Sequence, residues 1–190
     1  MSKNFYIADL HFGHKNIIRY DNRPFKTVEE MDNALISNWN KTVSNEDCVW
    51  ILGDISWHDD DKTAQIFKRL NGTKILIKGN HDNIKRGSEL AKCFTSIQDY
   101  AELYLDKKNK VIMSHYPILF WNGQFRDSIH LYGHVHNSHQ WNMCENWLEE
   151  ARQLQDIPMR MYNVGCMMKY MDYTPRTLEE IINRYNNTTK

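Results

Sequence analysis

The chain has 190 residues, which is enough for one domain with a substantial buried core. Lysine and arginine together number 24, as do aspartate and glutamate, so the formal net charge is zero. Proteins that grip extended nucleic acid without sequence preference usually carry a basic excess, so this balance argues against that class. The four cysteines form no CxxC pair, which argues against a zinc ribbon and a disulfide framework. We expect one domain over residues 1–190, in a reducing compartment.

No apolar run approaches the roughly 18 residues that a membrane-spanning helix needs. The N-terminal segment enters a strand-like run at Phe5 and lacks the features of a signal peptide. We therefore expect a cytoplasmic protein with no membrane partner. The sequence carries no signal for its oligomeric state.

In the first half of the chain, short apolar runs alternate with amphipathic segments. The predicted elements are a strand at 5–8, a helix that begins after 27, a strand at 48–52, a helix at 63–70 and a strand at 75–77. The strands are predicted because these runs are short and rich in Val, Ile and aromatic residues. The first helix is predicted from an apolar stripe that runs from Val28 to Trp39. Thr27 and Glu30, at its start, have the spacing of a capping box.

The second half continues the alternation and adds a hairpin. The predicted elements are a hairpin of 102–105 and 110–113 joined by 106–109, a strand at 129–132, a helix at 146–155, a strand at 161–164 and a helix after 177. Thr177 and Glu180 repeat the capping-box spacing ahead of the last helix. Alternating strands and helices with one hairpin predict an α/β fold with mixed sheets.

Polar side chains follow five of the predicted strands at the point where each strand ends. The motifs are Asp9-Leu10-His11, Gly53-Asp54, Gly79-Asn80-His81-Asp82, Ser114-His115 and Gly133-His134-Val135-His136. Ligands of open α/β sheets bind at the carboxyl ends of the strands, so we expect these side chains to converge. Alternate residues of an extended backbone point the same way, which predicts a shared target for Asp9 and His11. The same reasoning applies to His134 and His136. We expect the glycines at 53, 79 and 133 to let the backbone turn sharply or come close to a ligand.

These motifs offer carboxylate, imidazole and amide groups, a mixed donor set without thiolates. Such a set suits manganese, iron, zinc, cobalt or nickel better than calcium or magnesium. Seven ligands are too many for one tetrahedral ion but suit two ions, roughly 3.5–4 Å apart, that share a bridging carboxylate. The candidates are Asp9, His11, Asp54, Asn80, His115, His134 and His136.

The ordered series DLH, GD, GNHD, SH and GHVH resembles the calcineurin-like metallophosphoesterase superfamily, in particular its small single-domain prokaryotic and phage members. The resemblance runs from Asp9 to His136, and the later segment Tyr162-Asn163-Val164-Gly165 is similar to the closing segment of the family. It implies a four-layer αββα sandwich in which two mixed β-sheets are flanked by helices.

The resemblance also implies a role for each matched position. Asp9, His11 and His136 would hold one metal ion, Asn80, His115 and His134 would hold the other, and Asp54 would bridge the two. His81 would bind no metal and would face the leaving group. Asp82 matches an acidic position that follows this histidine, and we expect it to orient His81.

The expected activity is hydrolysis of a phosphomonoester or phosphodiester by hydroxide that the metal ions activate, with His81 protonating the leaving group. We expect two divalent ions, with manganese first and iron, zinc, cobalt or nickel as alternatives. The expected substrate is a small phosphate ester, and nucleotides are among the candidates. Two alternatives stay open, a nuclease of the same superfamily and a non-catalytic scaffold on the same fold.

Several residues near the motifs have two interpretations. His14 can approach the substrate phosphate or bond within its own loop, and we assign it to substrate binding. His130 and His139 are expected to be surface or packing residues, and so is His58, which has the alternative of lining the rim of the site. We expect loops 57–61, 117–127 and 137–158 to select the substrate.

Overall fold

Short strands, five of them mostly buried, pair into two mixed sheets. A computed structural model describes residues 2–107, 109–155 and 159–188. The first sheet has the order β4-β3-β2-β1-β9, with β1 (Asn4–Ile7), β2 (Cys48–Ile51), β3 (Thr73–Ile77), β4 (Ser96–Gln98) and β9 (Arg176–Thr177). The second has the order β5-β6-β7-β8, with β5 (Tyr100–Tyr104), β6 (Lys110–Ser114), β7 (Ile129–Tyr132) and β8 (Arg160–Asn163). Only β9 and β5 run antiparallel to their neighbours in the described chain.

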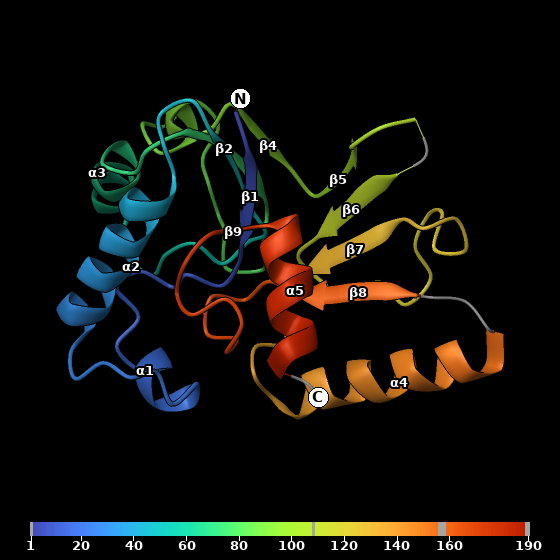
Figure 1. Cartoon of the computed structure of the whole chain (residues 1–190). Coiled ribbons are helices and arrows are strands. Elements are labelled where there is room, and N and C mark those ends of the chain that lie inside the picture. The colour runs from blue at the N-terminus through green and yellow to red at the C-terminus, as the bar shows by residue number, and fades with distance from the viewer. Residues whose placement is uncertain (1, 108, 156–158, 189–190) are drawn as a thin grey trace.

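Helices cover the outer faces of the two sheets (Figure 1). They are α1 (Ile17–Tyr20), α2 (Val28–Thr42), α3 (Asp60–Lys68), α4 (His139–Gln155) and α5 (Leu178–Thr188), with a short 3-10 helix η1 (Ala91–Cys93). In Figure 1, α2 and α3 lie outside the first sheet, and α4 lies below the second. The expected four-layer αββα sandwich is confirmed. None of the helices within the described ranges is long and apolar enough to cross a membrane.

Alternation along the strands of the second sheet divides the core in two. Val111 and Met113 of β6 join the main core, which also holds Ile7 of β1. Ile112, between them, faces the other way and packs in a smaller core with Leu148 of α4. Because side chains alternate along a strand, each face of β6 is covered by a different layer. β6 therefore lies between two apolar layers, and His115 follows directly after its last residue.

The capping boxes are confirmed, and two helices begin earlier than predicted. The Thr27 side chain accepts a hydrogen bond from the Glu30 backbone N–H at 3.1 Å, and Glu180 and Thr177 bond reciprocally. The helix expected at 63–70 begins at Asp60, because the Asp59 carboxylate caps it there. The helix expected at 146–155 begins at His139. The short elements α1, β4 and β9 were not predicted, since a few residues give no readable period.

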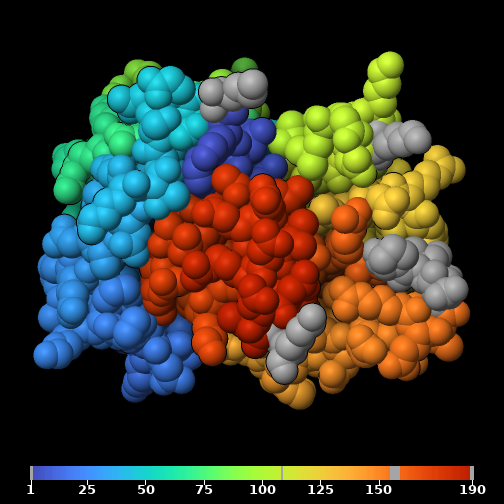
Figure 2. Space-filling model, viewed as in Figure 1, coloured from blue at the N-terminus to red at the C-terminus, as the bar shows by residue number. Residues whose placement is uncertain are grey.

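The carboxyl ends of the parallel strands of both sheets meet in one place. Ala8, after β1, pairs with Gly165, after β8, in a parallel bridge. The Ala8 N–H donates to Val164 O at 2.8 Å, and the Cys166 N–H donates back to Ala8 O at 2.8 Å. In the space-filling view, the red C-terminal segment with α5 fills the front between the blue-to-green and the yellow-to-orange parts (Figure 2). The two sheets are thus joined beside the predicted metal ligands.

Candidate metal centre

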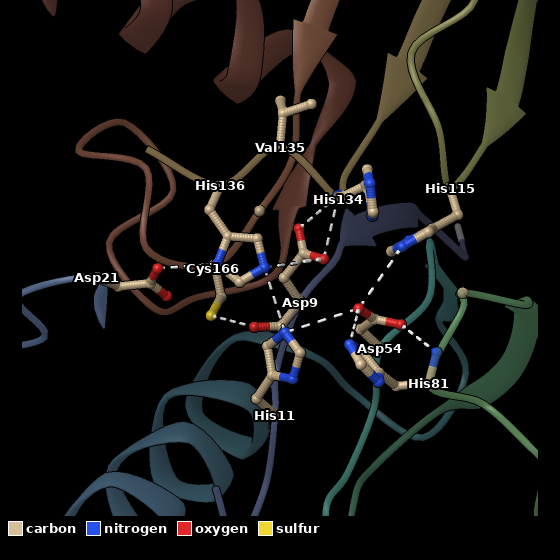
Figure 3. A network of polar contacts seen from close by, with 12 residues as sticks. Asp9, His11, Asp21, Asp54, His81, His115, His134, Val135, His136 and Cys166 are labelled. Carbon is tan, nitrogen blue, oxygen red and sulfur yellow. Dashed lines mark hydrogen bonds and ion pairs between the residues drawn. The ribbon is translucent and has the colours of Figure 1, made fainter. Parts of the chain in front are cut away.

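One group of candidate ligands comes from the segments that follow β1 and β7. Asp9, His11 and His136 offer ligand atoms that all lie within 4.8 Å of one another. Nε2 of His11 lies 3.2 Å from Nε2 of His136, which in turn lies 3.8 Å from an Asp9 carboxylate oxygen (Figure 3). Asp9 and His11 are buried. These three donors converge on one point, as the chain motifs predict.

A second group lies beside the first. Asp54, His115 and His134 also offer ligand atoms within 4.8 Å of one another. Nε2 of His115 lies 3.6 Å from Oδ2 of Asp54 and 3.1 Å from Oδ1 of Asn80. The same Asp54 oxygen is 3.8 Å from Nε2 of His11, in the first group. The Asp54 carboxylate therefore lies between the two groups, where a bridging ligand would have to be.

The backbone under the paired ligands is not extended, and that part of the prediction is wrong. Asp9 and His11 have φ of 55° and 52°, and His134 and His136 have φ of 69° and 49°. Each of these residues is in the left-handed region, which costs a non-glycine residue about 1–2 kcal/mol. The side chains still converge because the residues between them, Leu10 and Val135, are buried in the core.

Two of the predicted glycines allow a close approach of the loops. A Cβ at Gly79 would lie 2.2 Å from Oδ1 of Asp54, and a Cβ at Gly53 would lie 2.4 Å from Nδ1 of His115. Gly53 also has a φ of 87°, which favours glycine. The loops after β2, β3 and β6 can therefore bring their polar side chains together only with glycine at these positions.

Two of the histidines have fixed ring orientations. Nδ1 of His115 lies 2.8 Å from the Leu52 carbonyl oxygen, to which it donates, so Nε2 faces Asp54. Nδ1 of His136 lies 2.8 Å from a carboxylate oxygen of Asp21. Outer hydrogen bonds of this kind direct the other ring nitrogen toward a metal ion and raise its basicity.

No sequence motif indicates the pair of residues behind His136, which is Asp21 and Arg23. Arg23 is buried and binds the Asp21 carboxylate through Nε at 3.0 Å and Nη2 at 2.9 Å. Its guanidinium also donates to the backbone oxygens of Asp9 at 2.9 Å and of Leu10 at 3.0 Å. Arg23 thereby ties His136 to the turn that carries the Asp9 carboxylate. A carboxylate and a guanidinium in an ordinary-looking loop carry no motif by which to find them.

The electrostatics of the site suit cations. Burial raises the pKa of Asp9 to about 6 and lowers the pKa of both His11 and His134. Neutral imidazole is the form that binds a metal ion, and a nearby dication returns a buried carboxylate to its charged form. Nδ1 of His11 is buried with no hydrogen-bond partner among the described residues. The donor set therefore fits two divalent ions.

A family model described as calcineurin-like phosphoesterase matches residues 5–186. The chain belongs to this family. The resemblance read from the motifs is thus confirmed, and it now extends over nearly the whole chain. The two groups of His and Asp side chains could each hold a metal ion.

Two curated proteins match part of the chain at substantial sequence identity. The chain is 48% identical over 84 residues to an uncharacterized protein of Methanocaldococcus jannaschii, a match to 43% of the chain and 48% of that protein. It is 39% identical over 85 residues to the Gene 66 protein of Mycobacterium phage L5, covering 43% of the chain and 41% of that protein. These two matches span less than half of each relative.

A solved structure matches the whole fold. A protein of unknown function from Aquifex aeolicus has a TM-score of 0.71 and 27% identity, over 96% of this chain and 99% of that one. The Gene 66 protein of Mycobacterium phage D29 is 29% identical over 163 residues, covering 72% of this chain and 80% of that protein. The fold of this chain thus recurs in a bacterial protein, and its sequence is similar to that of a phage protein over most of the length of both.

His81 lies at the open edge of the phosphoesterase centre. Its side chain is 41% exposed, and Nε2 lies 4.0 Å from Oδ2 of Asp54. Its backbone N–H donates to the other Asp54 oxygen at 3.0 Å, which holds the turn against the centre. The ring therefore reaches the proposed bridging carboxylate yet remains open to a substrate.

The Asp82 carboxylate accepts hydrogen bonds from the backbone of the two loops beside His81. One carboxylate oxygen accepts from the N–H groups of Gly79 at 2.8 Å and Asp54 at 2.9 Å, and the other accepts from Ile55 N–H at 3.0 Å. These bonds bind the turn that carries His81 to the segment that carries Asp54. Orientation of His81 by Asp82, expected from the sequence, stays a prediction, and the contacts found for Asp82 link two loops.

The remaining histidines divide between the site and the packing. The His14 ring stacks on Trp57, with 4.3 Å between centroids, and lies 5.7 Å from the His11 ring. His130 is buried and accepts from the Ile118 N–H, so its packing interpretation is confirmed. His58 bonds to Asp32 and lines a pocket beside the centre, which follows the alternative interpretation. His139 is exposed at the start of α4.

Proposed function

We propose that this phosphoesterase hydrolyses small phosphomonoesters or phosphodiesters with two divalent metal ions. The observation that supports it best is the Asp54 carboxylate, within 4 Å of histidines from both ligand groups. In this proposal one ion binds Asp9, His11 and His136, the other binds Asn80, His115 and His134, and Asp54 bridges them. Manganese is the expected ion, with iron, zinc, cobalt or nickel as alternatives.

The bound ions would lower the pKa of a coordinated water and neutralise the phosphoryl oxygens. The protein keeps the ligands in place before substrate arrives, because the Leu52 carbonyl oxygen and the Asp21 carboxylate hold the rings of His115 and His136. Preorganised groups need no rearrangement during the reaction, which is where such sites gain their rate.

His81 is our candidate for the general acid. An alkoxide leaving group needs a proton, and an imidazolium near neutral pH can supply it. Its Nε2 faces the centre while the ring is partly exposed, so a substrate oxygen can reach it. His14 lies on the same side, beside Trp57, and we assign it to the substrate edge of the site.

The test is a substrate panel with and without metal. Purified protein is assayed with nitrophenyl mono- and diesters, nucleotides and oligonucleotides, with added Mn²⁺ and again after chelation. We expect hydrolysis of small esters that chelation removes and Mn²⁺ restores. Asp54→Asn should lose most activity and bound metal, whereas Asp61→Asn, on the exposed first turn of α3, should keep both.

Each alternative predicts a different result in this panel. Hydrolysis of oligonucleotides with little turnover of small esters would favour a nuclease. Protein that binds two metal ions and hydrolyses no ester, or protein that binds no metal, would favour the scaffold and overturn the proposal.

A further inference from the structure

An exposed indole stands on a rigid backbone beside the proposed metal centre. Trp57 is 51% exposed, although large apolar side chains are usually buried in a fold of this kind. Its backbone N–H donates to Phe12 O at 2.7 Å, and Phe12 forms a parallel bridge with Ser56. The segment with Trp57 is therefore fastened to the loop that follows the His11 ligand.

A second contact locks the same two loops together. The Asp32 carboxylate accepts from the Gly13 N–H at 3.0 Å and lies 3.1 Å from Nε2 of His58. A Cβ at Gly13 would lie 2.4 Å from the His58 ring, so only glycine admits this ring. Ser56 and His58, the chain neighbours of Trp57, are thus held in place before any ligand binds. Preorganisation of this kind lowers the entropic cost of binding.

The indole links the metal centre to a pocket. Its ring stacks on His14, 4.3 Å away at an interplanar angle of 28°, and lies 4.6 Å from the ring of His81. Trp57 and His81 both line a pocket of about 350 Å³ on the side of α3. Pockets of this size hold small organic molecules. A leaving group that departs from the phosphate on the side of His81 would enter this pocket.

The chemistry of the lining favours an uncharged, flat, hydrogen-bonding group. Ile84 and Leu90 supply apolar surface, and Asp60 and Asn83 supply polar groups. Among the described lining residues there is no lysine or arginine, and the Asp60 carboxylate would repel a second phosphate. A carboxylate accepts hydrogen bonds only, so it selects a group that carries N–H donors.

We infer that this pocket is a nucleobase subsite, in which the base of a nucleoside monophosphate stacks on Trp57 while the single phosphate lies at the metal centre. Every base presents a flat π-face to an indole, and adenine, guanine and cytosine carry amino groups for Asp60. The balanced charge of the chain favours a small nucleotide over a long strand. This inference rests on the proposed function, because the phosphate is placed by the metal ligands.

The decisive measurement is binding to the Mn²⁺-loaded protein by calorimetry, with each ligand used as its phosphonate analogue, whose P–C bond the proposed activity does not hydrolyse. Adenosine 5′-monophosphate is compared with ribose 5-phosphate, which has the same phosphate and sugar but no base. We expect the nucleotide to bind at least tenfold more tightly, which equals about 1.4 kcal/mol and lies within the range for base stacking on an aromatic ring. Trp57→Ala should remove this preference and leave the affinity for ribose 5-phosphate within about twofold.

Matched variants separate stacking from folding. Trp57→Phe keeps a flat ring and should retain most of the preference. Tyr104→Ala removes a ring that is 65% exposed at the far end of β5, and should change neither affinity. Equal affinity of the wild-type protein for both ligands, or an equal loss of both in Trp57→Ala, would overturn the inference.

The two proposals fail in different ways. If the nucleotide binds with a preference that depends on Trp57 but no ester is hydrolysed, the subsite stands and the proposed function fails. If small esters are hydrolysed but the base adds no affinity, the proposed function stands and the subsite fails.

Discussion

The carboxylate of Asp21 lies 2.8 Å from Nδ1 of His136, on the side of the ring away from Asp9. This hydrogen bond fixes the tautomer in which Nε2 faces the first ligand group, and buried Arg23 holds the carboxylate in place. Asp21 belongs to none of the motifs, yet it determines how a proposed ligand is presented. It is therefore the first residue to test outside the ligand set.

Asp21→Asn should weaken metal binding without removing the site. An amide cannot accept the His136 proton as strongly as a carboxylate and leaves Arg23 with an unpaired charge. Loss of such an outer contact typically costs about 10- to 100-fold in metal affinity or activity. Metal affinity is measured by competition with a chelator, and Asp61→Asn serves as control. Unchanged affinity in Asp21→Asn would show that the ring is oriented without Asp21.

His81→Ala should separate metal binding from turnover. No ligand group contains His81, so the variant should bind as many metal ions as the wild type. General acid catalysis contributes about 10²–10⁴-fold, and we expect a loss of that order on an ester with an alkyl leaving group. The loss should be milder on nitrophenyl esters, whose leaving group needs no proton. Full activity on the alkyl ester would refute the role of His81 as acid.

Asp82→Ala should destabilise the fold more than a surface substitution. Three backbone N–H groups lose their acceptor, and a buried unsatisfied donor costs about 1–3 kcal/mol. We expect the free energy of unfolding, measured with urea, to fall by about 2–3 kcal/mol. Asp82→Asn keeps one acceptor oxygen and should lose less. A variant with normal stability but altered pH dependence of turnover would instead support direct action on the His81 ring.

Gly79→Ala should disrupt the centre, because its Cβ would lie 2.2 Å from Oδ1 of Asp54. Overpacking of this kind costs about 1–3 kcal/mol, and here the atom that must move is on the proposed bridging ligand. Metal stoichiometry by mass spectrometry should therefore fall. Gly87→Ala is the control, since a Cβ there meets nothing within 4 Å. The only cost is the backbone strain of an alanine at a φ of 81°. Equal metal content in the two variants would count against the position of Asp54 between two ions.

Much of the site was determined by local sequence. The apolar runs predict the strands, since short Val, Ile and aromatic segments suit buried sheets. The motif at the end of each strand predicts the convergence of Asp9 and Asp54, because β1 and β2 are parallel neighbours that end at one edge of the first sheet. The meeting of Asp54 with His115, which follows β6 of the second sheet, depends on how the two sheets pack. Gly79 was predicted to admit a close approach of the loops, because glycine has no side chain.

Only the tertiary structure decided what supports the ligands and what lies around them. Asp21 and His136 are 115 positions apart, and no local pattern links two such residues. The left-handed backbone of Asp9 is imposed by the packing around it, against its intrinsic preference. The stacking of Trp57 on His14 likewise depends on two loops that the Asp32 side chain brings together. Sequence specifies which groups are available, and long-range packing specifies which of them meet.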